Sequence, residues 1–255
     1  MATPVKSEEP FIRVRGLRKR FGKQEVLCGV DLDIFHGETL LIIGPSGEGK
    51  TVLIKHIIGL LRPDEGTVVV DGVEVNKLRE RELAPVRKRV SMLFQGGALF
   101  DSLTVERNTA FPLIEAGVRD RDEIDRRVRE ALEAVDLYEH RHKLPVNLSG
   151  GMRKRAGIAR AIIGRTQCIL YDEPNSGLDP IVADVIDQMI LRMQKRYGVT
   201  SLVVTHDMNS VFKIADRIAF LKRGVIHFLG TREELRASTD PEVQDFIEGR
   251  SGITC

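Results

Sequence analysis

TLLIIGPSGEGKTVLIKHI, residues 39–57, contains the pattern that decides the fold of this chain. A run of apolar residues leads into a glycine-rich turn with the spacing G-x-x-x-x-G-K-T, and apolar residues at helical spacing follow. This order predicts a buried strand, a tight turn and the start of a helix. The glycines allow a backbone path that directs successive N–H groups inward, and the helix adds its positive end, so the turn suits a polyphosphate.

Two side chains after the turn fit the same ligand. Lys50 is expected to reach the terminal phosphates, and Thr51 is expected to offer its hydroxyl to a magnesium ion shared with them. A glycine turn can arise by chance, but a preceding strand and a following helix are the context of a genuine phosphate loop.

The composition is that of an ordinary globular protein. Of the 255 residues, 30% are charged and 42% are hydrophobic, and the formal net charge is +2, so the global balance requires neither nucleic acid nor an anionic membrane. No apolar run approaches the about 20 residues that a bilayer span needs, and residues 1–10 are polar where a signal peptide would be apolar. The chain is therefore expected in the cytosol. Its cysteines, Cys28, Cys168 and Cys255, have neither metal-ligand nor disulfide spacing.

Strand and helix signals alternate along the rest of the chain. Alternating residues from Phe11 and from Val26 predict two short strands, and Asp71 with Gly72 predicts the turn of a further hairpin. Residues 121–136 have the apolar spacing of an amphipathic helix. A last hairpin is expected to turn at residues 223–224.

Residues 90–113 differ from their surroundings because apolar and aromatic residues fill a segment that is expected to be rich in loops. A short strand reaches Gln95, two glycines follow, and the apolar residues that come next are Leu99, Phe100, Leu103 and Phe111. They either belong to the core or form a docking groove for an apolar segment of a partner.

Two further segments carry polar residues suited to a nucleotide. Ser149 can cap an Arg-rich helix while Gly150 and Gly151 bring backbone N–H groups close to a ligand, although such a start more often only caps a helix. The buried strand of CILYDEP ends in Asp172 and Glu173, at the sheet edge where open α/β folds bind ligands. Strand alternation is expected to direct one carboxylate to magnesium and the other to an attacking water.

Two more polar residues extend this edge. Asp179, in the turn NSGLDP, is expected to hydrogen-bond backbone near the phosphates. His206 ends the buried strand of TSLVVTH, where a histidine is often structural but a ring N–H could also touch a γ-phosphate.

The order of these motifs resembles that of the nucleotide-binding subunit of ABC-type ATPases, from Phe11 to about Leu235. The resemblance rests on GPSGEGKT, Gln95, LSGGM at residues 148–152, ILYDEP, SGLD and His206. LSGG together with the phosphate loop is very specific, whereas either alone is not. The resemblance implies an α/β P-loop NTPase with a RecA-like parallel sheet core, an N-terminal antiparallel β element and a helical signature subdomain.

The same resemblance implies domain boundaries. Residues 11–237 are expected to form the ATPase domain, with the helical subdomain inserted at about 97–163. Residues 1–10 are expected to be a flexible tail and residues 238–255 a C-terminal extension.

The resemblance also implies a role for each motif residue, with ATP and Mg²⁺ as cofactors. The implied catalytic residues are Lys50 of the Walker A motif, Glu173 as the base and His206 as the switch histidine. The implied metal ligands are Thr51, Gln95 and the Walker B residue Asp172. Phe21 stands where an aromatic residue, commonly tyrosine, stacks on adenine. The implied nucleotide-binding set is Phe21, Gly44, Pro45, Ser46, Gly47, Glu48, Gly49, Lys50, Thr51, Val52, Ser149, Gly150 and Gly151.

Members of this family work as head-to-tail dimers. By the resemblance, Ser149 and Gly151 of one copy meet the γ-phosphate held by the phosphate loop of the other, so a homodimer with ATP at its interface is implied. Met152 replaces the glutamine that is common after SGG, and Phe21 lacks a hydroxyl, but neither departure removes a catalytic group.

A narrower resemblance is carried by LFQGGALFDSLTVERNTAFPL, by SGGM and by DPEVQDFIEG. These segments are similar to the ATPases of Mce-associated lipid transporters, of the Mla or Mkl type. That similarity implies ATP-driven movement of phospholipid or a related lipid through separate permease subunits, which dock near residues 95–112. It also implies an Mce-type lipid-binding protein in the complex, and a peripheral position on the cytoplasmic face of the inner membrane.

Other classes share part of this pattern. A soluble ABC-type ATPase acting on a scaffold, as in iron–sulfur cluster assembly, would use the same partner groove, and an ABC importer ATPase for another small solute would share the catalytic motifs. ABC proteins that act on nucleic acid usually have two tandem cassettes or a long coiled-coil insert. This chain has one cassette and no sustained heptads, so no nucleic-acid partner is expected.

Overall fold

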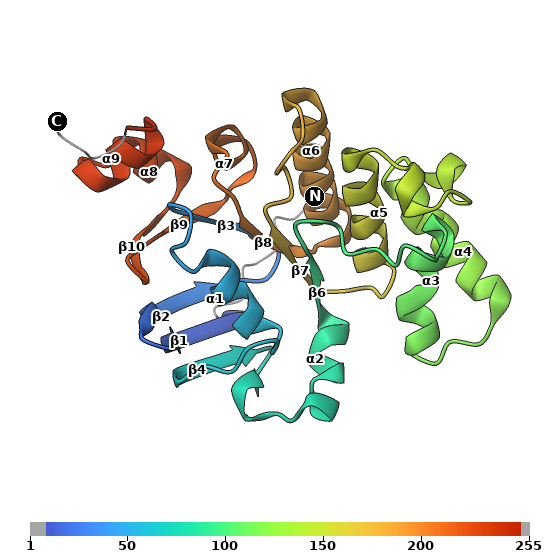
Figure 1. Ribbon diagram of the computed structural model, residues 1–255, viewed down its shortest axis with the longest axis horizontal. Coiled ribbons are helices and arrows are strands. Elements are labelled where there is room, and N and C mark those ends of the chain that lie inside the picture. Colours follow the sequence, from blue (N-terminus) through green and yellow to red (C-terminus); the bar gives the residue numbers. More distant parts are fainter. Residues whose placement is uncertain (1–8, 251–255) are drawn as a thin grey trace.

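Two β-sheets form the frame of the computed structural model, which describes residues 9–250 (Figure 1). The first sheet is antiparallel, in the order β2-β1-β4-β5, and consists of β1 (Ile12–Phe21), β2 (Gln24–Ile34), β4 (Glu65–Val70) and β5 (Val73–Glu74). The second has the order β10-β9-β3-β8-β7-β6 and consists of β3 (Thr39–Ile43), β6 (Val90–Leu93), β7 (Cys168–Asp172), β8 (Thr200–Val204), β9 (Arg217–Lys222) and β10 (Val225–Gly230). Its strands are parallel except for β10 at one edge.

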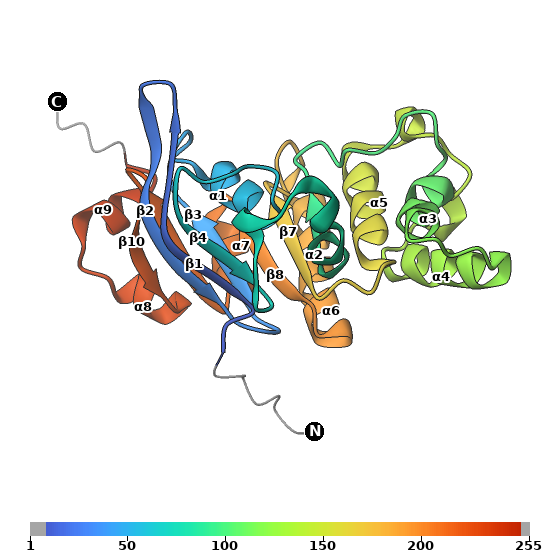
Figure 2. The same cartoon turned by 90° about the horizontal axis from the view of Figure 1, so that it is seen from below.

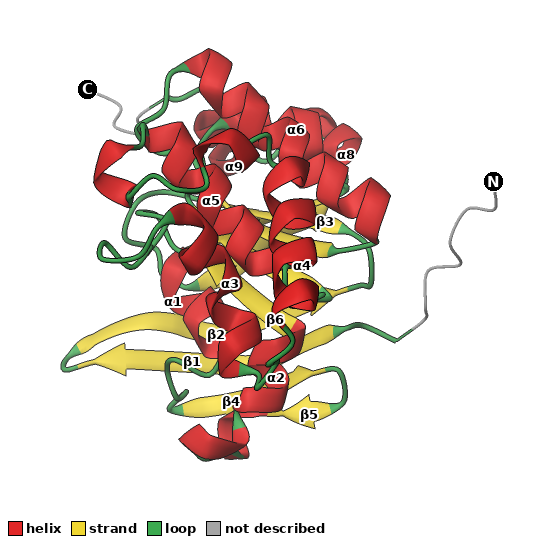
Figure 3. Ribbon diagram, turned by 90° about the vertical axis from the view of Figure 1, so that its right-hand side faces the viewer, coloured by secondary structure: helices red, strands yellow, loops and turns green. Residues whose placement is uncertain are grey.

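The central strands of the second sheet are buried on both faces, which explains their apolar sequences. Every residue of β3, β7 and β8 is buried, as expected for parallel strands covered on both sides. Leu41 and Ile43 of β3 pack in a core with the helices, whereas Leu40 and Ile42 pack in a second core with the antiparallel sheet. Figure 3 shows the two layers, with most of the helices on one side and the antiparallel sheet on the other.

The helices separate into groups along the molecule. They are α1 (Lys50–Ile57), α2 (Ala84–Arg89), α3 (Val105–Glu115), α4 (Arg121–Ala134), α5 (Gly150–Ile162), α6 (Pro180–Tyr197), α7 (Met208–Ile214), α8 (Arg232–Ala237) and α9 (Pro241–Ile247). Helices α3, α4 and α5 gather at one end, and α8 and α9 lie at the other (Figures 1 and 2). Within residues 9–250, no helix is long and apolar enough to span a bilayer.

Most predicted elements are confirmed. The strands from Phe11 and Val26, the turns at residues 71–72 and 223–224 and the helix at 121–136 are all present. Cys168 is buried and Cys28 is half-buried, whereas Cys255 and residues 1–8 of the expected tail lie outside the described residues.

The expectation that residues 90–113 are loop-rich throughout is wrong for the second half of the segment. Helix α3 begins at Val105, after Thr104 as N-cap, and contains Phe111. Its signal is weak because Pro112 lies inside it and because its buried face includes the polar residue Asn108. The Asn108 amide bonds the backbone of residues 100–104, donating to three carbonyls and accepting from the Phe100 N–H at 2.8 Å. A buried asparagine therefore holds the preceding loop in place.

The C-terminal helix α9 packs on its own chain. The Phe246 ring lies 5.0 Å from the Phe220 ring of β9, between centroids, and Val243 is buried. These apolar residues of α9 therefore pack against their own chain.

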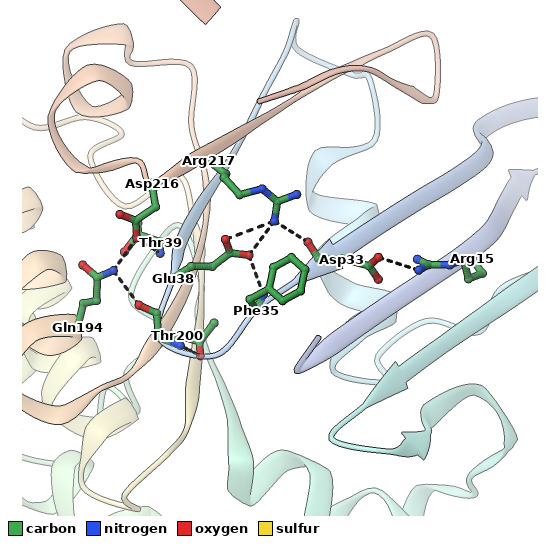
Figure 4. Close-up of polar contacts among 10 residues, drawn as sticks. Arg15, Asp33, Phe35, Glu38, Thr39, Gln194, Thr200, Asp216 and Arg217 are labelled. Carbon is green, nitrogen blue, oxygen red and sulfur yellow. Dashed lines mark hydrogen bonds and ion pairs between the residues drawn. The ribbon is translucent and has the colours of Figure 1, made fainter. Parts of the chain in front are cut away.

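A polar network joins the two sheets where β2 leads into β3 (Figure 4). The fully buried side chain of Glu38 accepts hydrogen bonds from the Phe35 N–H at 2.7 Å and from Arg217 Nη1 at 3.2 Å. The same guanidinium donates to the Asp33 carbonyl at 3.2 Å. The Arg217 side chain of β9 therefore donates hydrogen bonds both to a backbone carbonyl near the end of β2 and to the buried carboxylate that precedes β3.

Replacing Arg217 is expected to destabilise the fold through this network. R217M removes the Arg217 guanidinium from the buried Glu38 carboxylate, and breaking a buried ion pair in this way typically costs about 3 kcal/mol. R15M is the matched control, because Arg15 pairs with Asp33 at 2.7 Å on the surface, where an ion pair contributes under about 1 kcal/mol. Urea unfolding of both variants measures the difference. Equal effects of R217M and R15M would contradict the account, and E38Q should restore part of the stability lost in R217M.

Candidate active site

The loop between β3 and α1 contains one position, Gly44, that has room only for glycine. Gly44, Gly47 and Gly49 all have positive φ, and a Cβ on Gly44 would lie 2.1 Å from the Leu221 carbonyl oxygen. Gly49 is the N-cap of α1 and has no side chain to bond the first N–H groups. Those groups and the positive end of the helix dipole are therefore available to an anion. Pro45, Ser46 and Glu48 complete the loop, with Ser46 exposed.

Lys50 lies over this loop and is almost fully buried, at 7% exposure. Its Nζ donates to the carbonyl oxygens of Gly44 at 2.6 Å and of Pro45 at 2.8 Å. Burial lowers the pKa of the Lys50 ammonium, and the charges of Glu173, Glu48 and Asp172 oppose that shift. The loop thus holds a cation where a phosphate chain would be cradled.

Thr51 and Asp172 bring α1 and β7 together. The Thr51 hydroxyl donates to Asp172 Oδ1 at 2.7 Å, and Asp172 is 6% exposed. These oxygens suit Mg²⁺, which prefers oxygen ligands in octahedral geometry and keeps several positions for water and phosphate. Within residues 9–250, no group of three or more His, Cys, Asp or Glu is placed to hold a metal. Thr51 and Asp172 provide two oxygen groups, which fits an ion whose remaining octahedral positions would be filled by phosphate and water.

Glu173 has a different partner from Asp172. Its Oε2 lies 2.9 Å from His206 Nδ1, and its backbone N–H donates to the Val204 carbonyl at 3.0 Å. Strand alternation does not explain this divergence, because β7 ends at Asp172 and Glu173 has a left-handed backbone with φ 50°. The turned backbone sends the Glu173 carboxylate toward the residues that follow β8.

Gln95 and Asp179 do not lie on the phosphate loop. The exposed Gln95 donates from Nε2 to the Ser176 hydroxyl at 3.1 Å, and none of its described bonds reaches Thr51 or Asp172. Asp179 bonds backbone, as expected, and the groups it accepts from are the N–H groups of Ile181 and Val182 at the start of its own helix, α6.

The SGG segment lies apart from the phosphate loop. Ser149 caps α5, accepting from the Met152 N–H at 3.3 Å, and a Cβ on Gly151 would meet Val182. Figures 1 and 2 both show α1 and α5 separated along the molecule, with β7 between them. Among the described contacts, no hydrogen bond or ion pair joins residues 149–151 to residues 44–52. One chain therefore does not assemble the whole predicted nucleotide set.

Phe21 and Val52 complete the predicted residues. Phe21 ends β1 with 46% exposure, and Lys19 Nζ lies 5.6 Å from its ring centroid. An exposed ring beside a cation is free to stack on a planar ligand. Val52 is half-buried on α1 and packs against the core next to the antiparallel sheet.

Sequence reasoning missed two buried polar groups beside the site. Asn175 Nδ2 donates to Asp187 Oδ1 and to Ser210 Oγ, both at 2.8 Å, and burial raises the pKa of the Asp187 carboxyl. Lys154 of α5 is 5% exposed and contacts backbone of the site. Asp187 and Lys154 both occupy the buried stripe of an amphipathic helix. In the sequence, both groups could have been found as polar residues at positions where a predicted amphipathic helix should be apolar.

A glycine loop bonded to a buried lysine, with a threonine–aspartate pair at the carboxyl edge of a parallel sheet, defines a nucleoside-triphosphate-binding protein of the P-loop class. Residues 27–176 match the family described as "ABC transporter". The chain belongs to this family.

Individual relatives agree with the family. The "Probable ribonucleotide transport ATP-binding protein mkl" of Mycobacterium leprae is 42% identical over 239 residues, 94% of this chain and 69% of that protein. The "Intermembrane phospholipid transport system ATP-binding protein MlaF" of Haemophilus influenzae is 40% identical over 241 residues, 94% of this chain and 91% of that protein. A dimeric post-hydrolysis structure of the ATP-binding cassette MJ0796, bound to ADP and Pi, has a TM-score of 0.80 and 32% identity over 86% of this chain and 98% of that one.

These findings confirm the predicted P-loop fold and ATP hydrolysis. The chain is the ATP-hydrolysing cassette of an ABC transporter. Cassettes of this family dimerise and work with membrane permeases.

Proposed function

We propose that this chain hydrolyses ATP at sites shared between two copies, and that hydrolysis powers movement of a phospholipid or related lipid through separate permease subunits. The observation that carries the shared site is the separation, within one chain, of the phosphate loop from the glycine-containing start of α5 at residues 149–151. In a head-to-tail pair, Ser149 and Gly151 of one copy complete the site around Lys50 of the other.

Binding is assigned to the phosphate loop and its neighbours. Lys50 and the backbone N–H groups of residues 44–52 bind the phosphates, while Phe21 stacks on adenine. Thr51, Asp172 and Gln95 would hold Mg²⁺ together with the nucleotide, and Gln95 would have to exchange its hydrogen bond to Ser176 for this role. When bound, the ion would supply charge neutralisation for the transferred phosphoryl group.

Glu173 is assigned as the base. Its carboxylate accepts the proton of the attacking water, and the His206 ring 2.9 Å away fixes its orientation. A second contact of the His206 ring, to the γ-phosphate, is proposed to make this residue respond to the presence of that phosphate.

The lipid assignment rests on the relatives and on the segment after Gln95. MlaF of Haemophilus influenzae matches this chain over 91% of its length, and its name specifies intermembrane phospholipid transport. On this chain, Phe100 is 44% exposed and its ring lies 4.7 Å from that of Phe111. With the loop held by Asn108, this aromatic pair offers a fixed apolar surface to a permease helix. An Mce-type lipid-binding protein completes the proposed complex, on the cytoplasmic face of the inner membrane.

Substituting the base and the loop lysine should separate hydrolysis from binding. E173Q is expected to lower kcat by about 10²–10⁴-fold, the usual contribution of a general base, and to accumulate a dimer containing ATP. K50A is expected to form no such dimer, because its loop loses the cation that binds phosphate. ATP turnover and size-exclusion chromatography with ATP and Mg²⁺ measure both effects. A normal rate for E173Q would refute the assignment of the base.

The lipid proposal predicts what the chain carries when it is isolated from gently solubilised membranes. A multi-span permease, an Mce-type protein and bound phospholipid should co-purify with it, as identified by mass spectrometry. F100S should reduce permease recovery because it removes the exposed ring, whereas the control L60S, at a residue of similar exposure (45% against 44%), should not. Recovery of a permease without the Mce-type protein and lipid would contradict the proposal that lipid is the substrate. Recovery of soluble scaffold proteins alone would contradict the proposed role in transport.

A further inference from the structure

Lys154 is a buried cation beside the nucleotide site that the assigned chemistry does not use. It lies on α5, five residues after the Ser149 cap, and is 5% exposed. Its Nζ donates to the backbone carbonyl oxygens of Gln95 and of Glu173, the latter at 3.2 Å. Burying an ammonium is costly unless it is bonded, so these two carbonyls are the compensation that keeps it there.

The two carbonyls lie on segments that follow β6 and β7, beyond the point where the hydrogen-bonded pairing of these two strands ends. The β6–β7 ladder pairs Val90 with Cys168 and ends at Leu93 with Tyr171. Gln95 and Glu173 each lie two residues beyond that last pair. Lys154 therefore bridges the segments where the backbone ladder between them has stopped.

Side-chain and turn contacts close the bridge into a ring. Gln95 Nε2 donates to Ser176 Oγ at 3.1 Å, and the Ser176 N–H donates to the Glu173 carbonyl at 3.1 Å. The same Glu173 carbonyl accepts from Lys154. The position of the Glu173 backbone is thus set jointly by α5 and by the segment containing Gln95.

We propose that Lys154 is a positioning residue for ATP hydrolysis, which fixes the Glu173 backbone to Gln95 and to α5. Within the described residues its hydrogen bonds go to these two backbone carbonyls, and its charge is also attracted to the nearby Asp172 and Glu173 carboxylates. We infer that it acts on the reaction through the placement of Glu173, and the cationic variant K154R keeps the charge while changing the bridge. The inference rests on the proposed role of Glu173 as the base. Because α5 begins at the SGG segment and Gln95 adjoins the proposed permease surface, movement of either one reaches the base through this side chain.

The test is the kinetics of K154M, which keeps most of the side-chain volume and removes the charge and the donors. Its kcat is expected to fall about 10–100-fold, the scale on which small misplacement of a reacting group lowers rates, with KM for ATP unchanged. K154R, which retains a cation with several donors, should recover part of kcat. K154M/E173Q should still form the ATP-dependent dimer, because nucleotide binding is intact.

R155M is the matched control. Arg155 is the next cation on α5 and also donates to two backbone carbonyls, those of Val135 and Asp136 at 3.3 and 3.0 Å, away from the site. A purely structural role for Lys154 predicts that both variants lose thermal stability and that neither loses kcat per folded molecule. If K154M does not fold, the same kinetic measurement is made on K154Q, which keeps one donor group.

The outcomes separate this inference from the proposed function. Normal kcat in folded K154M or K154Q, with E173Q inactive, would overturn the role of Lys154 alone. An equal loss of kcat in R155M would also overturn it. Normal kcat in E173Q would overturn the assignment of the base, on which the inference depends.

Discussion

The hydrogen bond from the Thr51 hydroxyl to Asp172 is the contact on which the site depends. It joins residues 121 positions apart in the sequence, at the first turn of α1 and the last residue of β7, at 2.7 Å. The constraint behind it is the burial of the parallel sheet on both faces. Strands that are apolar along their whole length leave polar groups only at their ends. The polar residues of the site therefore lie together at the carboxyl edge of the sheet. They are Lys50 after β3, Asp172 and Glu173 at the end of β7, and His206 after β8.

The same arrangement leaves the site open on one side. The SGG segment begins a helix at the far side of β7, although its cap and glycines have the character of an anion site. We propose that a second copy supplies these groups, which requires no refolding of the chain. ATP bound between two copies would contact both, so its binding would stabilise their association and its hydrolysis would weaken it. That cycle provides the movement that the permease would receive.

Local signals in the sequence predicted much of the fold and of the site. The phosphate loop was predictable because its conformation depends on a strand end, glycines and a helix start that lie within a few residues of one another in the sequence. Helix α3 was not, because Pro112 and Asn108 interrupt its apolar pattern and the use of Asn108 depends on the loop at residues 100–104. The backbone bonding of Asp179 was predictable, but its particular donors were not named, although an Asp directly before Pro180 is a usual cap for the helix that follows. The bridge made by Lys154 depends on where three segments meet, which spacing alone does not specify.

The most direct test of the shared site is the specific ATPase activity of the unmodified chain as its concentration is lowered, with sedimentation measured in the same buffer containing ATP and Mg²⁺. A site built from two copies predicts that activity per chain falls together with the fraction of dimer. Constant activity per chain, at concentrations where sedimentation detects only monomers, would show that one copy completes the site and would contradict the account.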